Sequence, residues 1–454
     1  MKKRIPLIAL SVALLLGAFL LIMTRLHSPQ EVLSPPNPNG ENRKLQQAFE
    51  RAVGSGTEYK LQYPAEGEYR SAYVLYDIDG DEESEAVVFY SRTADEGSVR
   101  VHILDYVDDE WVSLIDTSGY GSRIDSVTFA DLNNDGTSEV IFSWSLSGTD
   151  SSRTMTVHSV KLDSKPELKT LSNMSYKAMG VYDMDNDGAK EILVLWNETT
   201  RKVQHNYAAL MKMKGNSLQQ VGDEISLDST ASVYDGVYIQ EGQTPMAFVD
   251  ALKDDNTMFT EVIWWDAAAQ TLRAPFTDND THTNVSTLRA SAIPVKDIDE
   301  DGLIEIPVAY SNTGSSGTSG RTAGDDADEE EPIALNSWSV TGTAEPGVLQ
   351  TKAYGMIDTT NRYVLQVDAS FRDSILFYRN KKTGVITAYS VTENGRGEPL
   401  FSLVYSASGK PKSWNSEYTF LSEQGERAVF GTLTSAGTSA GITNETIQNS
   451  LVFY

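Results

Sequence analysis

The chain of 454 residues contains no cysteine. Disulfide bonds, thiol chemistry and lipid attachment through cysteine are therefore excluded for this sequence. Basic residues are also scarce, because 37 lysines and arginines stand against 64 aspartates and glutamates and leave a formal net charge of −27. This charge argues against nucleic acid or anionic lipid headgroups as partners, and it favours the accumulation of divalent cations at the surface.

Recognisable catalytic motifs are lacking as well. The five histidines are His27, His102, His158, His205 and His282. None of them stands in a catalytic spacing with a serine or a carboxylate, and no GxSxG, HExxH or phosphate-binding glycine loop occurs. Because scattered catalytic residues would leave no motif, an enzymatic function stays open.

What the sequence does contain is an acidic nine-residue pattern that occurs four times. Each copy places oxygen-bearing side chains at its positions 1, 3, 5 and 9. These candidate ligands are Asp77, Asp79, Asp81 and Glu85 in the first loop; Asp131, Asn133, Asp135 and Glu139 in the second; Asp183, Asp185, Asp187 and Glu191 in the third; and Asp297, Asp299, Asp301 and Glu305 in the fourth.

This pattern has the chemistry of a calcium loop. Ca²⁺ prefers roughly six to eight oxygen ligands, and alternate side chains of a tight loop can converge on one ion. Position 6 is glycine in three copies, which permits the positive φ that the turn requires, whereas the first copy has Glu82 there. Without a cation the clustered carboxylates would repel one another. We therefore predict up to four Ca²⁺ sites; a solvated acidic turn is the alternative.

The sequence around the loops excludes an EF-hand. An EF-hand needs flanking helices and a glutamate at position 12, but that position is Val88, Phe142, Val194 or Val308 here. Short β-branched and aromatic runs stand on both sides of each loop instead, which predicts strand, loop, strand. The aromatic residues five positions after each glutamate are Tyr90, Trp144, Trp196 and Tyr310. We interpret them as packing residues at the ends of buried strands.

The spacing of the loops predicts the architecture. Their first residues, 77, 131, 183 and 297, recur at a period that leaves room for one hidden repeat, for which residues 237–249 are the candidate. The same period places further strand–turn–strand units at 356–365 and 418–430. Repeats of ~40–55 residues with several strands each are typical of a β-propeller. We predict an all-β fold, a seven-bladed β-propeller of four-stranded antiparallel blades over residues 58–454.

At the four loops the sequence resembles FG-GAP/VCBS-type repeats, the calcium-loop blades of the integrin α-subunit propeller and of bacterial surface-anchored proteins. The resemblance is specific at the DxDxDG loops, and the first loop departs from it at Glu82. It implies calcium-clasped blades and an extracellular setting.

The N-terminus predicts a membrane anchor. Residues 6–23 carry no charge and follow the basic start of the chain, without a small-x-small cleavage site behind them. We predict a cytoplasmic N-terminus at 1–4 and a single-pass transmembrane signal anchor at 5–24, with the remainder exported from the cytoplasm. A cleaved signal peptide and a buried helix are the alternatives. Residues 25–57 are expected to form a proline-rich tether and a short amphipathic helix at about 42–53.

Three further expectations concern the propeller itself. A strand at 58–63 is predicted to complete the last blade and close the ring. Residues 311–332 are predicted to be a disordered insertion that ends in a solvated acidic run. Pro307 would interrupt a ladder and indicates a bulge or an edge strand.

These observations favour a non-enzymatic scaffold. We expect a calcium-binding propeller that is anchored in the cell membrane by its N-terminal helix and binds an unknown protein or glycan ligand through its loops. The alternative is a secreted polysaccharide-active enzyme, a lyase or hydrolase on a calcium-loop propeller.

Overall fold

The structure is a computed structural model that describes part of the chain. The described residues are 41–95, 97–146, 153–290, 293–310, 327–330, 332–339, 348–393, 395–407 and 418–454. The predicted cytoplasmic N-terminus, the anchor at 5–24 and most of the tether lie outside them. Within these ranges no helix is long and apolar enough to span a membrane.

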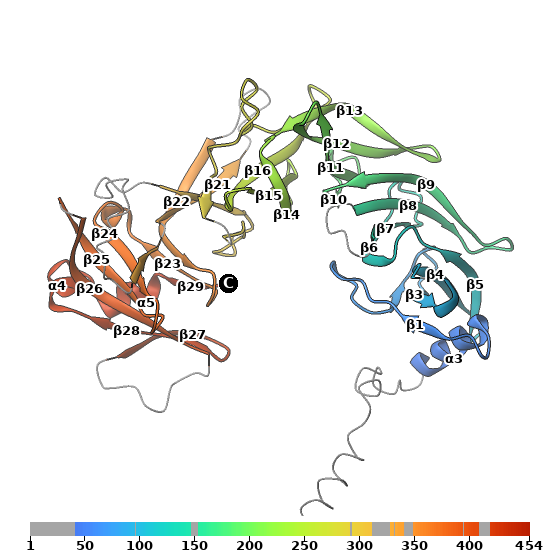
Figure 1. Cartoon of the computed structure of the whole chain (residues 1–454), viewed down its shortest axis with the longest axis horizontal. Coiled ribbons are helices and arrows are strands. Elements are labelled where there is room, and N and C mark those ends of the chain that lie inside the picture. The colour runs from blue at the N-terminus through green and yellow to red at the C-terminus, as the bar shows by residue number, and fades with distance from the viewer. Residues whose placement is uncertain are drawn as a thin grey trace, which may run out of the picture.

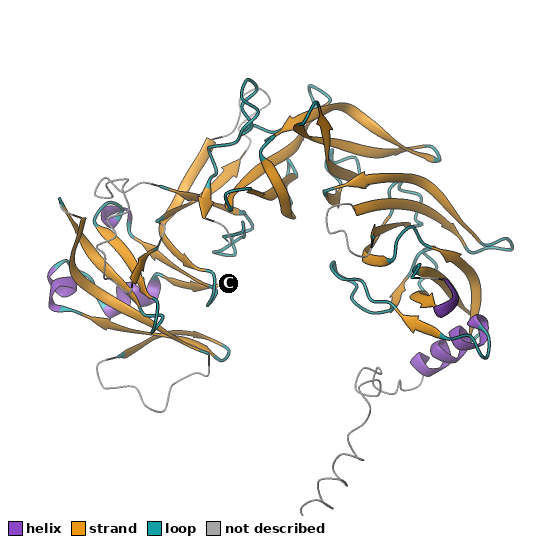
Figure 2. Ribbon diagram, viewed as in Figure 1, coloured by secondary structure: helices purple, strands orange, loops and turns teal. Residues whose placement is uncertain are grey.

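The described chain is built almost entirely from antiparallel strands, as the all-β prediction requires. It forms six sheets that follow one another along an arc, from the N-terminal sheet at one end to the C-terminal sheet at the other (Figure 1). Figure 2 shows that the helices gather at the two ends of this arc.

The first three sheets are built mainly from strands that neighbour one another in chain order. The first contains β1 (Tyr59–Leu61), β2 (Tyr73–Tyr76), β3 (Glu85–Arg92), β4 (Arg100–Val107) and β5 (Glu110–Ser118), with the 3-10 turn η1 (Thr93–Asp95). The second contains β6 (Arg123–Ala130), β7 (Glu139–Ser145), β8 (Arg153–Lys161) and β9 (Glu167–Tyr176). The third contains β10 (Ala178–Tyr182), β11 (Glu191–Thr200), β12 (Val203–Lys214) and β13 (Ser217–Leu227).

The last three sheets are less regular, because segments distant in the chain join them. The fourth contains β14 (Ala231–Gln240), β15 (Met246–Lys253), β16 (Thr257–Asp266), β17 (Thr271–Arg273) and β18 (Arg289–Ala290). The fifth contains β19 (Glu305–Ala309), β21 (Ile333–Ser339), β22 (Val348–Asp358), β23 (Tyr363–Val367) and β29 (Leu451–Phe453). The sixth contains β20 (Ala327–Glu329), β24 (Ile375–Asn380), β25 (Ile386–Thr392), β26 (Gly395–Ser406), β27 (Thr419–Gln424) and β28 (Arg427–Leu433), near η2 (Ala369–Phe371), α4 (Ser435–Ser439) and α5 (Asn444–Asn449).

Helix α3 (Glu41–Val53) covers the outer face of the first sheet and confirms the predicted short helix. Successive residues of β3 point to opposite faces. Val87 and Phe89 pack toward the second sheet, whereas Val88 and Tyr90 pack against the helix. In α3, Phe49 is fully buried and meets Tyr90 edge to face at 5.1 Å between ring centroids. The helix thus covers the face that a neighbouring blade would cover in a closed ring.

The predicted closure by the strand at 58–63 is wrong. Strand β1 pairs with β3 of the first sheet, with Tyr59 opposite Arg92 and Leu61 opposite Tyr90. The reason is local, since β1 and β2 share the same edge of β3 and Tyr59 packs edge to face on Phe49 at 5.3 Å. A terminal repeat that is capped by its own preceding segment needs no partner from the far end of the chain.

The repeat prediction is confirmed in part. The hidden repeat at 237–249 is the β14–β15 hairpin, and it opens the fourth sheet. The hairpin at 356–365 stays in the fifth sheet, because the long β22 pairs with both β21 and β23. The unit at 418–430 is the β27–β28 hairpin, but it extends the sixth sheet. The described residues therefore form six sheets, and seven separate blades are not confirmed.

The structure also bears on the predictions for the 311–332 insertion and for Pro307. Most of the 311–332 insertion lies outside the described residues, but Ala327–Glu329 forms strand β20 on β24, so this end of the acidic run is not a solvated tail. The physical reason is that this segment pairs with β24, and that the Arg379 guanidinium lies 2.6 Å from the Glu330 carboxylate. Pro307 lies in β19, which is the edge strand of the fifth sheet, as predicted.

Candidate metal centre

The first three acidic loops each join two paired strands, and the fourth leads from an isolated bridge at Lys296 into β19. The glutamates of all four loops fold back in the same way. Glu85, Glu139, Glu191 and Glu305 each begin a strand and are almost fully buried. In each case Oε2 accepts the backbone N–H of the residue at loop position 2, over 2.6, 3.0, 2.8 and 2.8 Å respectively. That position-2 residue is itself buried, as Ile78 and Leu132 are. The glutamate and the apolar anchor together fix the loop to the sheet.

The aspartate at position 1 holds the turn together. Its Oδ2 accepts the backbone N–H of position 6 in every loop, for example from Gly136 to Asp131 at 2.9 Å and from Glu82 to Asp77 at 3.1 Å. Position 6 has a positive φ throughout, including +73° at Glu82. The first loop therefore makes the same turn without a glycine at that position.

The loops lie side by side at one end of neighbouring sheets. Ser138 of the second loop donates its backbone N–H to Ile78 O of the first at 2.7 Å, and Lys190 of the third donates to Asp131 O at 3.4 Å. The first loop carries its glycine at position 4, where a Cβ on Gly80 would lie 2.4 Å from the Gly136 carbonyl oxygen of the second loop. This close approach explains the glycine, and together with the two hydrogen bonds it places the first three loops next to one another.

The first loop concentrates negative charge. One oxygen from each of Asp77, Asp79 and Glu85 lies within 4.8 Å of the others, whereas Asp81 turns its Oδ1 to the Glu83 N–H. Glu85 Oε1 and Asp79 Oδ1 are buried and have no hydrogen-bond partner among the described residues. Burial, and then the neighbouring aspartates, raise the pKa of Glu85 to about 7.

The charges that act on the first loop are all negative within the part of the chain that the structure describes. Burial raises the pKa of Asp79, and the carboxylates of Asp81, Asp105 and Asp77 raise it further. Oxygen donors, a buried oxygen without a partner and net negative charge are what a hard divalent cation requires. These residues fit Ca²⁺.

The second loop makes the same turn but carries less charge. Among the described residues, its three acids do not form a group with oxygens within 4.8 Å of one another, as acids of the other three loops do. Asn133 stands at position 3 and donates from Nδ2 to Glu139 Oε1 at 3.2 Å. Burial raises the pKa of Glu139, and Asp135 and Asp131 add to the shift. The Thr137 hydroxyl lowers the pKa of Asp135 by donating to it. The donor set again consists of oxygens, with one carboxylate fewer than in the first loop.

In the third loop the positive charge is supplied by a lysine side chain of the protein itself. The Lys212 ammonium lies 2.7 Å from Asp185, 2.6 Å from Asp187 and 2.8 Å from Glu191. Together with Asp183, these are all four residues that the sequence predicts as ligands, and their oxygens form one cluster. Although burial opposes it, hydrogen bonds to these carboxylates raise the pKa of Lys212 above its usual value.

The fourth loop also contains a lysine, which comes from a different strand. Lys352 of β22 contacts Asp301, lies 2.9 Å from Glu305 and lies 3.9 Å from Asp299. Asp297 and Asp299 cluster with Glu305, and Asp297 Oδ2 accepts the Gly302 N–H. Hydrogen bonding to Asp301 and Glu305 outweighs burial and raises the pKa of Lys352 to about 12.

Neither lysine is part of the sequence motif, because Lys212 lies on the neighbouring strand and Lys352 lies two strands away. Ile192 pairs with Met211, so Lys212 comes opposite Glu191, the last residue of its loop. The same register places Asp105 opposite Glu85 and Ser159 opposite Glu139. Each of these residues follows its glutamate by 20 or 21 positions, a spacing that could have indicated them.

The strand–turn–strand units that lack the acidic loop have buried carboxylates that are paired or hydrogen-bonded. In the fourth sheet Asp250 pairs with Arg289 at 2.6 Å, with both side chains fully buried. Glu261 of the same sheet is fully buried and accepts the Thr277 hydroxyl at 2.6 Å, and burial raises its pKa to about 7. In the 356–365 hairpin Asp358 is held by Arg379 at 3.1 Å.

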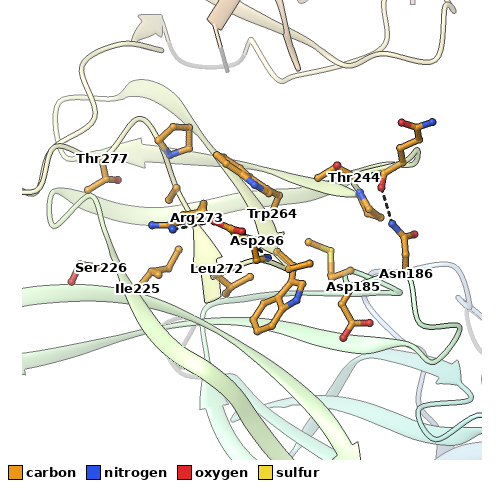
Figure 3. Close-up of a pocket in the computed structure, with 18 of the residues that line it drawn as sticks. Asp185, Asn186, Ile225, Ser226, Thr244, Trp264, Asp266, Leu272, Arg273 and Thr277 are labelled. Atoms are coloured by element: carbon orange, nitrogen blue, oxygen red, sulfur yellow. Dashed lines mark hydrogen bonds and ion pairs between the residues drawn. The ribbon is translucent and has the colours of Figure 1, made fainter. Parts of the chain in front are cut away.

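A pocket of about 730 Å³ lies beside the third loop, between the third and fourth sheets. Figure 3 shows Asp185 on one side and Trp264, Asp266 and Arg273 of the fourth sheet on the other. Asp266 pairs with Arg273 at 3.0 Å, and hydrogen bonds lower the pKa of Asp266. Asp185 is bonded to Lys212. Asp266, with its lowered pKa, is unlike the acid with a raised pKa that glycoside hydrolysis needs, so the lining suits binding better than acid catalysis.

The comparisons with known proteins give no family. No protein-family model matches the chain, and no curated protein matches it. Among solved structures, a complex of BBS1N with ARL6DN, soaked with lead, is 8% identical with a TM-score of 0.29, over 82% of this chain and 95% of that one. Two structures of Sqt1 from Chaetomium thermophilum are 11% and 10% identical, each with a TM-score of 0.31; they cover 78% and 84% of this chain and 94% and 99% of theirs. TM-scores this low do not define a shared fold.

Proposed function

We propose that this chain is a non-enzymatic calcium-binding scaffold of the β-propeller type, anchored in the cell membrane with its sheets outside the cytoplasm. The observation that carries the calcium proposal is Glu85. It is 1% exposed, it is grouped with Asp77 and Asp79, and its Oε1 is buried with no hydrogen-bond partner among the described residues. A buried anionic oxygen in such a position is costly unless a cation neutralises it.

The first and second loops are the proposed calcium sites. Asp77, Asp79 and Glu85 would hold the ion in the first, and Asp131, Asn133, Asp135 and Glu139 in the second. A bound Ca²⁺ would neutralise these oxygens and stabilise the turn. For dissociation constants of ~10⁻⁴–10⁻³ M and ~1 mM Ca²⁺, mass action gives about 0.4–1.4 kcal/mol per site. The proposed role of calcium is therefore structural.

At the third and fourth loops calcium would have to displace an ammonium group. Lys212 and Lys352 already supply positive charge there, at hydrogen-bond distances from Glu191 and Glu305. We propose that these two loops are held by lysine at physiological calcium concentrations.

The partner is proposed to bind at the surface that carries the loops. The pocket beside the third loop has a volume in the range of small-ligand sites and combines paired charges with Asn186, Thr277 and the edge of Trp264. This mixture of neutral polar, paired ionic and aromatic groups suits a glycan or a polar protein loop. A panel of glycans would be added to the protein in solution, and quenching of Trp264 and Trp265 fluorescence by a soluble quencher would be measured. Protection of this fluorescence by a glycan would support a glycan as the partner.

The membrane anchor rests on the uncharged run 6–23 and the basic residues before it. A protease added outside intact cells should digest the sheets of the anchored protein and leave its N-terminus protected. Recovery of the whole protein in the soluble fraction, or protection of the sheets, would refute the anchor or its orientation.

Thermal unfolding of the full-length chain in detergent tests the calcium proposal. In excess chelator the melting temperature should be lower by a few degrees than in millimolar Ca²⁺, and Mg²⁺ should not reproduce the rise. The double variant D131A/D135A should lose about half of the rise. The control D223A/E224A removes two exposed acids of β13 and should keep all of it. No calcium-dependent rise and no bound calcium on titration would refute the proposal.

A further inference from the structure

The residue across the strand from each loop's glutamate stands where it can act on the loop's cation. Directly opposed residues of an antiparallel pair have side chains on the same face of the sheet. Lys212 shows the consequence, because from the position opposite Glu191 its ammonium reaches Asp185, Asp187 and Glu191 at 2.6–2.8 Å. A side chain at this position is therefore directed into the carboxylate cluster.

In the first sheet the same position is Asp105, since Leu104 pairs with Ala86. Asp105 thus carries a charge opposite to that of Lys212. Its carboxylate acts electrostatically on both Asp79 and Glu85. The lysine that the third sheet has at this position is thus replaced in the first sheet by a further acid.

We infer that the residue opposite the glutamate decides which cation the first and third loops take, and that Asp105 is the specificity determinant that reserves the first loop for a divalent ion. In the fourth loop this position is Ser337, and the lysine comes instead from β22. This inference rests on the proposed function. The aspartate side chain is shorter than that of lysine, so Asp105 acts on the ion by its charge and not as a direct ligand. Ser159 leaves the second loop neutral at this position.

The size of the effect follows from the charges. A unit charge about 6 Å from a divalent ion in a water-exposed setting changes its binding constant by about three- to tenfold at moderate ionic strength. Replacement by lysine reverses the sign and also brings an ammonium within reach of Glu85. D105N should therefore weaken calcium binding at the first loop by about three- to tenfold, and D105K should abolish it.

The experiment is calorimetric titration of the full-length protein with CaCl₂ in the D131A/D135A background, where the first loop is the calcium site under test. D105N is nearly isosteric and keeps the fold. D105K should show no calcium binding and yet a melting temperature in chelator at least as high as that of its parent, because the ammonium neutralises the carboxylates. The control E110K makes a similar charge reversal on exposed Glu110 of β5 and should bind as the parent does.

The outcomes separate the two proposals. A parent that binds calcium while D105N and D105K bind it equally well would overturn the role of Asp105 alone. A parent and a wild type that bind no calcium would overturn the calcium sites themselves. D105K without calcium binding but with a lowered melting temperature in chelator would show disruption and not substitution of the cation, and would also overturn the inference.

Discussion

The first and third loops make the same turn, but the negative charge of their carboxylates is neutralised in different ways. In both, the glutamate accepts the position-2 N–H, over 2.6 Å at Ile78 and 2.8 Å at Met184. In the third loop an ammonium lies among the carboxylates, whereas the charges acting on Glu85 in the first are all negative among the described residues. A DxDxDG loop therefore specifies a backbone shape and a cluster of oxygens, and the strand opposite specifies the positive charge.

The fourth sheet adds another solution to the same problem. Its hairpin has no acidic loop, and its buried acid Glu261 lies near Asp228, which is itself held by Lys253 at 2.9 Å. The raised pKa of Glu261 indicates that a proton neutralises it near neutral pH. Ammonium, proton and, as proposed, metal ion thus serve equivalent electrostatic needs in sheets of similar architecture.

The largest expected effect comes from removing the internal cation of the third loop. K212S leaves Asp185, Asp187 and Glu191 together without an ammonium, so in chelator the protein should lose about 3–5 kcal/mol of stability, as buried pairs do when one partner is removed. Millimolar Ca²⁺ should restore much of this loss by taking the place of the lysine. Denaturant unfolding of the full-length protein with and without calcium measures both quantities.

The matched control is K214S, which removes an exposed lysine two residues further along β12. It should change stability by less than about 0.5 kcal/mol. If K212S and K214S behave alike in chelator, or if calcium leaves K212S as unstable as before, the third loop is not equivalent to the first.

A smaller effect on stability should show whether Glu261 is neutralised by a proton, in contrast to the third loop, which is neutralised by the Lys212 ammonium. Folded Glu261 keeps its proton up to about pH 7, whereas the unfolded side chain loses it near its ordinary value of 4.5. The folded state binds more protons between these values, so stability falls as pH rises from about 4.5 to 7 and is level above. The contribution is about 3 kcal/mol. E261Q cannot titrate, so its stability relative to wild type should rise over this window.

The measurement is denaturant unfolding of both proteins from pH 5 to pH 8. E224Q, on exposed Glu224 of β13, serves as the control and should follow the wild-type curve. A constant difference between E261Q and wild type across this range would mean that Glu261 is ionised when buried and would contradict this prediction.

The loops and their flanking strands could be predicted from sequence because both depend on local patterns. The strand predicted before the third loop is β10, and each position-9 glutamate begins a strand. Tyr90 and Trp144 are buried packing residues, as interpreted, whereas Trp196 and Tyr310 are half-buried. Hydrophobic alternation and turn residues are sufficient for such features.

The lysines of the third and fourth loops and the covering of the first sheet by α3 could not be predicted in the same way, because they depend on tertiary contacts. Lys352 reaches Glu305 from two strands away, across 47 positions. The packing of Phe49 on Tyr90 rather than on a distant blade depends on which face of the first sheet is left uncovered. Neither feature has a local signal of its own.

The smallest expected effect tests whether the first and second loops have the same backbone conformation. Glu82 adopts a φ of +73°, a conformation that costs a residue with a side chain of order 1 kcal/mol or more relative to glycine. E82G should therefore stabilise the protein in chelator by about 1 kcal/mol.

The reverse change, G136E in the second loop, places a side chain at φ +89°, where an added Cβ meets no atom within 4 Å. Its cost should come from the backbone and be of similar size. Denaturant unfolding in chelator measures both, and a loss of stability in E82G would show that Glu82 makes a favourable contact that outweighs its backbone strain.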